Sequence, residues 1–95
     1  MNYMVMVTIT HPSEMDKEAM AKFLKRSEAL DNPNIENIWW FEVDAKTPGS
    51  IISYKDKASY EADFPRVLKM RDEQKDSGRK LTFEAKGECF AILRD

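Results

Sequence analysis

Ile38-Trp39-Trp40-Phe41 is the most informative segment of the sequence, because it places four large apolar residues in succession within a segment typical of a β-strand. Side chains alternate across a strand, so Trp39 and Phe41 face one way while Ile38 and Trp40 face the other. A strand with one face in water would alternate apolar and polar residues, and this one does not. Both faces of the sheet therefore need cover, which a small chain can obtain from a second copy of itself.

Three further segments extend the sheet outward from the tryptophans. Residues 3–10 place apolar or threonine side chains on both faces and predict a central strand. The tryptophan strand is expected over residues 35–43, followed by a turn at residues 44–49 and an antiparallel strand at residues 50–55. These segments predict the middle of one antiparallel sheet.

Two helices are expected between the strands. Ser13 is a suitable N-cap for a first helix that would run to about Leu30. Asp56 would cap a second helix, and Gly78 would end it. Pro65 lies inside this second pattern, where proline removes a hydrogen bond and clashes with the preceding turn. The sequence therefore predicts a break or kink near Phe64.

The last apolar segment, residues 80–93, is long for one strand and contains Gly87 in its middle. A bulge or bend at Gly87 is expected, with an exposed half before it and a buried half after it. The element order is β-α-β-β-α-β, the ferredoxin-like α+β pattern with a four-stranded antiparallel sheet. Residues 1–95 then form a single domain whose helices cover one face of the sheet. The other face would expose an apolar patch too large for a monomer, which predicts a homodimer.

Composition excludes several classes of function. The formal net charge is −2 with acidic and basic residues interspersed, which argues against nucleic acid as a partner. Apolar runs fall far short of the ~20 residues of a membrane-spanning helix, so no membrane partner is expected. The N-terminus lacks a basic region and a cleavage site, so a cytoplasmic location is expected. The single cysteine and the single histidine make no zinc site by themselves, and no metal or cofactor is predicted.

The chain resembles the dimeric α+β barrel superfamily, which includes the antibiotic biosynthesis monooxygenase-like proteins. The resemblance covers nearly the whole chain and depends on length, element order, the Phe64-Pro65 interruption, strands that are apolar on both faces and a long last strand. It implies that two four-stranded sheets stack face to face, with a small-molecule pocket between each sheet and its helices. Fold likeness alone specifies no activity.

Members of this superfamily include cofactor-independent monooxygenases and haem-degrading enzymes. Their pockets use an asparagine, a tryptophan and, in some, a histidine, and by residue type the resemblance points to Asn37, Trp39 and His11 as catalytic candidates. The spacing of these residues reproduces no family motif. His11 is also the one side chain with an ordinary pKa near neutrality, although a histidine beside a proline in a loop is more often simply solvated. Haem binding through His11 is a further alternative.

Ligand-binding candidates come from the aromatic residues and one arginine. Trp40 faces away from Trp39, so one indole should line a pocket or the core and the other should meet a partner subunit. The remaining candidates, which would supply hydrogen bonds to an anionic enolate or phenolate, are Tyr54, Tyr60 and Arg71. The leading hypothesis is an enzyme acting on a small aromatic or polyketide-like compound, with a non-catalytic ligand-binding or structural dimer as the rival. A pocket lined by the inward tryptophan with His11 or Arg71 would favour chemistry, and an interior filled by phenylalanines and methionines would favour the rival.

Overall fold

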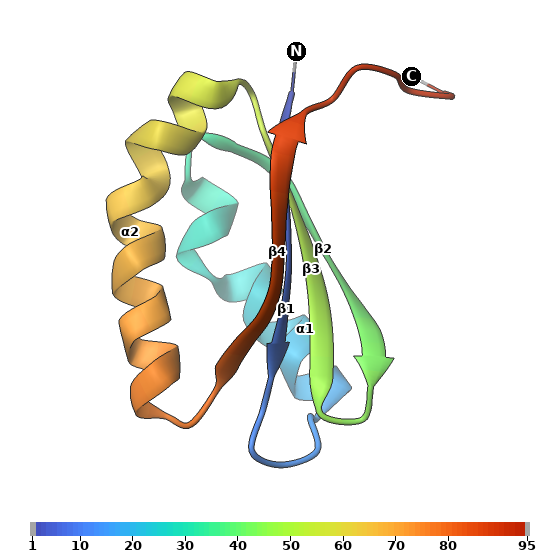
Figure 1. Cartoon of the computed structure of the whole chain (residues 1–95), viewed down its shortest axis with the longest axis vertical. Helices are drawn as coiled ribbons and strands as arrows, with labels where there is room; N and C mark the ends of the chain where they lie inside the picture. Colours follow the sequence, from blue (N-terminus) through green and yellow to red (C-terminus); the bar gives the residue numbers. More distant parts are fainter. Residues whose placement is uncertain (1, 95) are drawn as a thin grey trace.

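The computed structural model describes residues 2–94 and confirms the α+β, ferredoxin-like element order (Figure 1). The elements, in chain order, are β1 (Tyr3–Thr10), α1 (Lys17–Arg26), a short 3-10 helix η1 (Glu28–Asp31), β2 (Ile35–Asp44), β3 (Thr47–Tyr54), α2 (Lys57–Asp76) and β4 (Lys80–Glu88).

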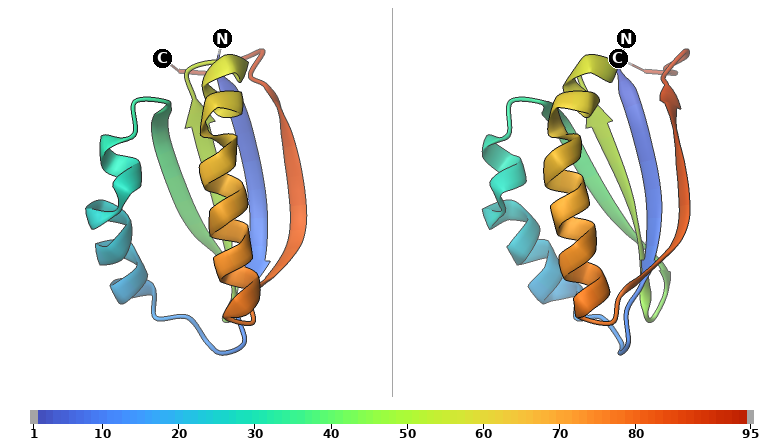
Figure 2. Two further views of the ribbon diagram at one scale, coloured as in Figure 1. Left: turned by 90° about the vertical axis from the view of Figure 1, so that its left-hand side faces the viewer. Right: turned by 60° about the vertical axis from the view of Figure 1, so that its left-hand side comes forward.

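The four strands form one antiparallel sheet in the order β2-β3-β1-β4. Val5 of β1 lies opposite Ile52 of β3 and Lys86 of β4, which fixes the register of the two central strands and one edge. Both helices lie on the same side of this sheet (Figure 2). We call the uncovered side the open face.

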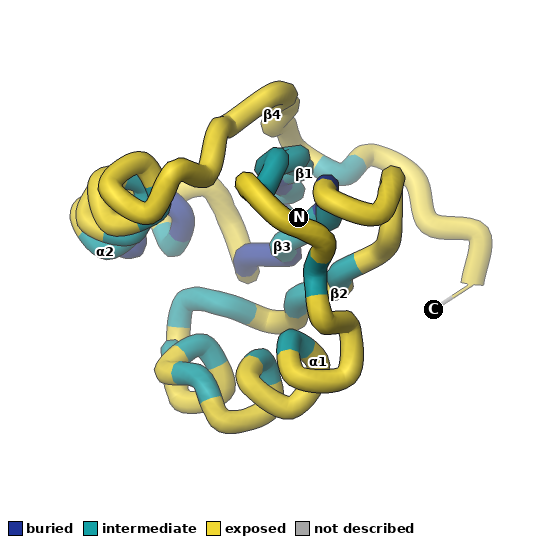
Figure 3. The backbone as a smooth tube through the Cα atoms, turned by 90° about the horizontal axis from the view of Figure 1, so that it is seen from below, coloured by how far each residue is buried: buried dark blue, intermediate teal, exposed yellow. Residues whose placement is uncertain are grey.

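The core lies between the sheet and α2. Tyr3, Val5 and Tyr54 from the sheet are buried against Tyr60 and Val67 of α2. The rings of Tyr3 and Tyr54 lie 5.0 and 5.4 Å from the ring of Tyr60, the spacing of favourable aromatic pairs. Buried segments cluster around β1, β3 and α2, while α1 is covered only in part (Figure 3).

The predicted start of the first helix is wrong. Asp16, not Ser13, is the N-cap, and its side chain accepts a hydrogen bond from the Ala19 N–H at 3.0 Å. The preceding loop is attached to the β2–β3 turn, because the His11 and Met15 N–H groups donate to turn carbonyls at 2.8 and 2.9 Å. These contacts occupy residues 11–15, so the helix begins after them. It ends at Arg26, and η1 covers the rest of the predicted span.

A break or a kink was predicted near Phe64, and the break is wrong, because α2 is continuous from Lys57 to Asp76. Pro65 is exposed, while its neighbours Asp63 and Val67 are buried on the opposite side of the helix. The carbonyl that loses its partner therefore faces water, and packing on both sides of the proline holds the helix together. The predicted ends are confirmed: Asp56 caps the helix, and Gly78 follows it with a φ of 79°.

Two strand predictions need correction. β3 begins at Thr47 rather than Ser50, so the turn is tighter than expected and Gly49 lies within the strand. Gly49 fits there because the Phe41 ring of β2 lies where its Cβ would be. β4 ends at Glu88, so the expected buried half is absent from the sheet. The register shift lies opposite Thr8 and Ile9, not at Gly87.

In the described part of the chain, neither helix is both long enough and apolar enough to cross a membrane.

Candidate functional site

A small cavity between the sheet and α2 brings together three of the predicted ligand-binding residues. Tyr54, Tyr60 and Arg71 all line it, along with mainly apolar side chains of β1 and α2. Its volume is about 30 Å³, which is the share of liquid volume that one water molecule takes. The cavity is therefore too small for an aromatic ligand.

The polar groups of these three residues already have partners within the chain. The Tyr54 hydroxyl donates to the Asp63 carboxylate at 2.7 Å, and the Lys86 ammonium donates to the Tyr60 hydroxyl at 3.0 Å. The Arg71 guanidinium forms an ion pair with Glu84 of β4, not with the Asp72 or Glu73 beside it on the helix. The three residues line one cavity, but their contacts with Asp63, Lys86 and Glu84 hold α2 on the sheet.

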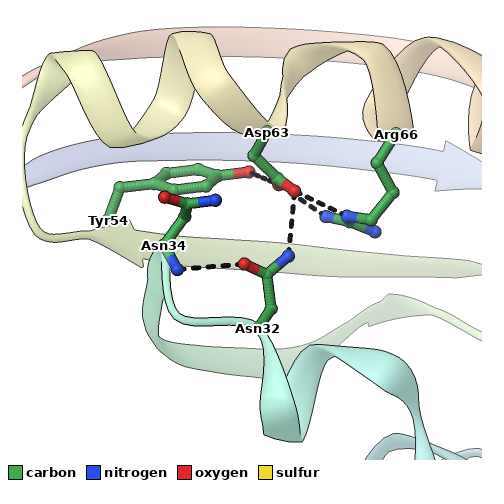
Figure 4. Close-up of polar contacts among 5 residues, drawn as sticks. All are labelled: Asn32, Asn34, Tyr54, Asp63 and Arg66. Carbon is green, nitrogen blue, oxygen red and sulfur yellow. Dashed lines mark hydrogen bonds and ion pairs between the residues drawn. The ribbon is translucent and has the colours of Figure 1, made fainter.

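Asp63 is the centre of a buried polar cluster that the sequence analysis did not predict (Figure 4). Its carboxylate accepts hydrogen bonds from Tyr54 of β3, from the Asn32 side chain at 2.9 Å and from two nitrogens of Arg66 at 2.8 Å. Asn32 in turn accepts from the Asn34 N–H at 3.0 Å. The cluster therefore ties α2 to β3 and to the connection between η1 and β2.

The cluster sets the protonation states of its members. Burial alone would raise the pKa of Asp63, but the hydrogen bonds from Arg66, Tyr54 and Asn32 outweigh it and lower that pKa. Burial, reinforced by the Asp63 carboxylate, raises the pKa of Tyr54 well above its ordinary range. Tyr54 is therefore a neutral phenol near pH 7, and its one proton is already donated to Asp63. The sequence signal for the cluster was the Asp63–Arg66 spacing, which places opposite charges on adjacent turns of a helix.

A larger groove lies between α1 and the β2–β3 hairpin, with a volume of about 250 Å³. Trp40 of β2 and Pro48 of β3 line it from the sheet. The side chains that line it from the helix side are mainly apolar, and they belong to Met15, Met20, Ala21 and Leu24. We call this space the α1 groove.

The α1 groove exists because α1 does not pack closely on the sheet. None of the ten described residues of α1 is buried, and Phe23 on this helix is 60% exposed. The helix stays near the hairpin through its preceding loop and through an ion pair between Lys17 and Glu42 at 3.2 Å. Lys25 also lines the groove, so cationic and anionic side chains surround an apolar interior.

The three predicted catalytic residues do not share a cavity. The His11 backbone N–H donates to the Lys46 carbonyl, so this residue lies at the turn end of β2. Asn37 lies near the other end of that strand, and at ~3.3 Å per residue the two positions are roughly 20 Å apart. The Asn37 side chain accepts a hydrogen bond from the next backbone N–H at 2.9 Å. Partial burial and the nearby Arg79 lower the pKa of His11.

Trp39 lies on the open face of the sheet, opposite to Trp40, as the alternation predicts. Trp39, Phe41 and Phe83 are 48%, 42% and 47% exposed. Phe83 of β4 is paired with Thr8 of β1, and Thr8 is paired with Gly49, which lies opposite Phe41. The Phe83 side chain therefore lies on the open face with Phe41. Three large aromatic residues therefore lie on a sheet surface that neither helix covers.

Among residues 2–94, no three His, Cys, Asp or Glu side chains gather into a group that could hold a metal ion.

No family model matches this chain, and no curated protein does.

Proposed function

We propose that this protein is a homodimer, built as a dimeric α+β barrel, and that each subunit binds one small aromatic molecule in its α1 groove. The observation that carries the proposal is the position of Trp40, which lines a space of about 250 Å³ beneath a helix with no buried residue. An indole beside methionine and leucine side chains is typical of sites for flat apolar ligands.

The aromatic surface of the open face supports the dimer. Contiguous apolar patches of this kind mark interaction sites on soluble proteins, and stacked sheets pack about 10 Å apart through their side chains. Trp39, Phe41 and Phe83 would then fill the space between two sheets related by a two-fold axis. The resemblance to the dimeric α+β barrels, which is a likeness of pattern, agrees with this arrangement.

The volume of the α1 groove limits the size of the ligand. A protein cavity of about 150 Å³ accepts one benzene ring, so about 250 Å³ fits one or two fused rings. Lys25 at the groove would tolerate a carboxylate or phenolate on such a molecule. Small aromatic acids and quinones are therefore the first compounds to test.

Binding is favoured over catalysis because the inward tryptophan lies with methionines, while Arg71 lines a separate and much smaller cavity. Oxygenase chemistry on the bound molecule stays a prediction from the resemblance. A cytoplasmic location likewise stays a prediction.

A thermal-shift screen of one-ring and two-ring aromatic acids and quinones tests the proposal. A ligand at one hundred times its Kd stabilises the folded state by about 2.7 kcal/mol, which raises the Tm of a chain of this size by roughly 10 to 20 °C. Ala21→Trp fills the groove and should abolish the shift. Ala62→Trp, an exposed position on α2, is the matched control and should retain it. If no compound raises the Tm, or if both variants bind equally, the α1 groove is not the site.

A further inference from the structure

The open face carries no charge along three rows of the sheet. The strand registers place four residues, one from each strand, side by side in each row. From one end of the sheet toward the other, the rows are Asn37, Ser53, Met4 and Gly87, then Trp39, Ile51, Met6 and Ala85, then Phe41, Gly49, Thr8 and Phe83. None of these twelve residues is charged, although 34% of the residues of the chain are. The face therefore suits a partner that buries no charge against it, because an unpaired buried charge is costly.

The side chains of the open face are also graded in size across the sheet. In the middle row, the largest side chain is Trp39 at the β2 edge and the smallest is Ala85 at the β4 edge. In the next row, the Phe41 ring lies where a Cβ of Gly49 would be, so it leans from the β2 edge toward the centre of the sheet. The surface is therefore uneven in a definite direction, from one edge strand to the other.

We propose that two copies of this chain stack their open faces about a two-fold axis parallel to the strands, so that Trp39 of each copy packs on Ala85 of the other. The proposal rests on the dimer of the proposed function and adds to it the axis and the contacts. Such an axis exchanges the two edges of the sheet and keeps each row opposite the same row. Phe41 of each copy then meets Phe83 of the other, and the lean of the Phe41 ring toward Gly49 leaves room for that contact.

The grading of the face identifies the second copy as the occupant. A two-fold interface requires a surface that is complementary to itself, and a face with a large edge and a small edge becomes so when the edges are exchanged. An axis across the strands would instead place Trp39 on Phe41 of the other copy at one edge, and Ala85 on Phe83 at the other. That arrangement would overpack the β2 edge and leave the β4 edge underfilled, and both cost stability.

The twist between packed sheets preserves these contacts. Aligned sheets cross at about 30°, and an edge strand lies ~7 Å from the centre of a four-stranded sheet, so edge residues shift by about 4 Å. Successive rows on one face are ~7 Å apart, because they are two residues apart along a strand. The shift is smaller than this spacing, so each row still meets the same row of the other copy.

An exchange of side-chain sizes within the middle row tests the axis by sedimentation equilibrium of the full chain. Trp39→Ala alone should raise the dimer Kd by about 100-fold or more, because a two-fold dimer loses two buried indoles. Ala85→Trp alone should also raise the Kd, because the new indole meets Trp39 of the other copy. The two changes combined restore one large and one small side chain to each contact. The Kd should then return to within about tenfold of the original value.

The matched control exchanges side-chain sizes along β4. Phe83→Ala combined with Ala85→Phe would restore the contacts of an axis across the strands, but not those of an axis along them. We expect this variant to dimerise no more tightly than Phe83→Ala alone. Recovery by this control and not by the Trp39 combination would overturn the proposed axis, and so would a failure of both combinations to recover, while a dimer would still stand.

Filtered NOE spectra of a mixed dimer, with one copy isotope-labelled and the other not, test the unaltered chain in case a variant does not fold. Within one copy, the Ala85 methyl group and β2 are three strand spacings or roughly 14 Å apart, so a cross-peak between this methyl and the Trp39 ring must join two copies. We expect this cross-peak. A dimer that lacks it overturns the axis alone, whereas a chain that is a monomer at every concentration overturns the dimer of the proposed function as well.

Discussion

Replacing Asp63 by asparagine should destabilise the protein more than any other isosteric change to an acidic residue of α2. Both carboxylate oxygens of Asp63 accept an N–H group of Arg66, one at each oxygen, and Asn32 and Tyr54 add one donor each. An asparagine amide carries donors on one of its two ends. Either orientation therefore places the amide NH₂ against an Arg66 nitrogen.

The expected cost is about 3 kcal/mol. Hydrogen bonds to a charged group contribute roughly 1.5 to 3 kcal/mol each, and removing one partner of a buried ion pair costs about 3 to 5 kcal/mol. The Arg66 side chain is 31% exposed, so water can replace part of the lost interaction and the lower end applies. For a chain of this size the loss corresponds to a fall in Tm of roughly 12 to 24 °C.

Chemical denaturation at a fixed protein concentration measures this loss, and Asp72→Asn, at an exposed position of the same helix, is the control. The folded-state pKa of Asp63 lies below the ordinary aspartate value, so its stabilisation is complete above about pH 4 and is lost as the pH falls through that lowered pKa. The difference between the unaltered chain and Asp63→Asn should therefore be constant from pH 7 to about pH 4 and shrink below that. Equal stabilities of the Asp63 and Asp72 variants at pH 7 would show that the Asp63 carboxylate does not hold α2 on the sheet.

Two further predictions concern Gly49 and His11. Gly49→Ala should destabilise the fold by about 1 to 3 kcal/mol, because the new methyl group must displace the Phe41 ring. Gly87→Ala is the control, because a Cβ at this position meets nothing within 4 Å. It should change the stability by less than about 0.5 kcal/mol. Equal effects of the two alanines in urea unfolding would contradict this role of Phe41. If the protein binds haem, titration should produce a Soret band that His11→Ala abolishes, and a band that survives the substitution would exclude His11 as the ligand.

Alternation along the strands predicted the element order and the side chains that share a face, because successive residues of a strand point to opposite sides of the sheet. Trp39 and Trp40 lie on opposite sides of the sheet because adjacent residues of a strand point to opposite faces. Local rules failed where tertiary contacts compete with them. Pro65 does not break α2, since buried Asp63 and Val67 fix the helix on both sides of it.

The candidate site was less predictable than the fold. Residue type selected Tyr54, Tyr60 and Arg71, and these do meet around one cavity, but their partners Asp63, Lys86 and Glu84 come from distant parts of the chain. His11 and Asn37 have suitable chemistry and lie at opposite ends of a strand. The tail beyond Glu88 was expected to continue the sheet, because an apolar segment alone does not say which surface will cover it.

The loose attachment of α1 has a kinetic consequence. A helix with none of its ten residues buried can detach at a free-energy cost well below that of global unfolding. The segment from the Asp16 cap to the Asn32 side chain, which anchors the far end to Asp63, would then open and close as one unit. Molecules would enter beneath α1 during these brief openings. The observed rate of association would then be limited by the opening rate of this segment and would level off at high concentrations of added compound.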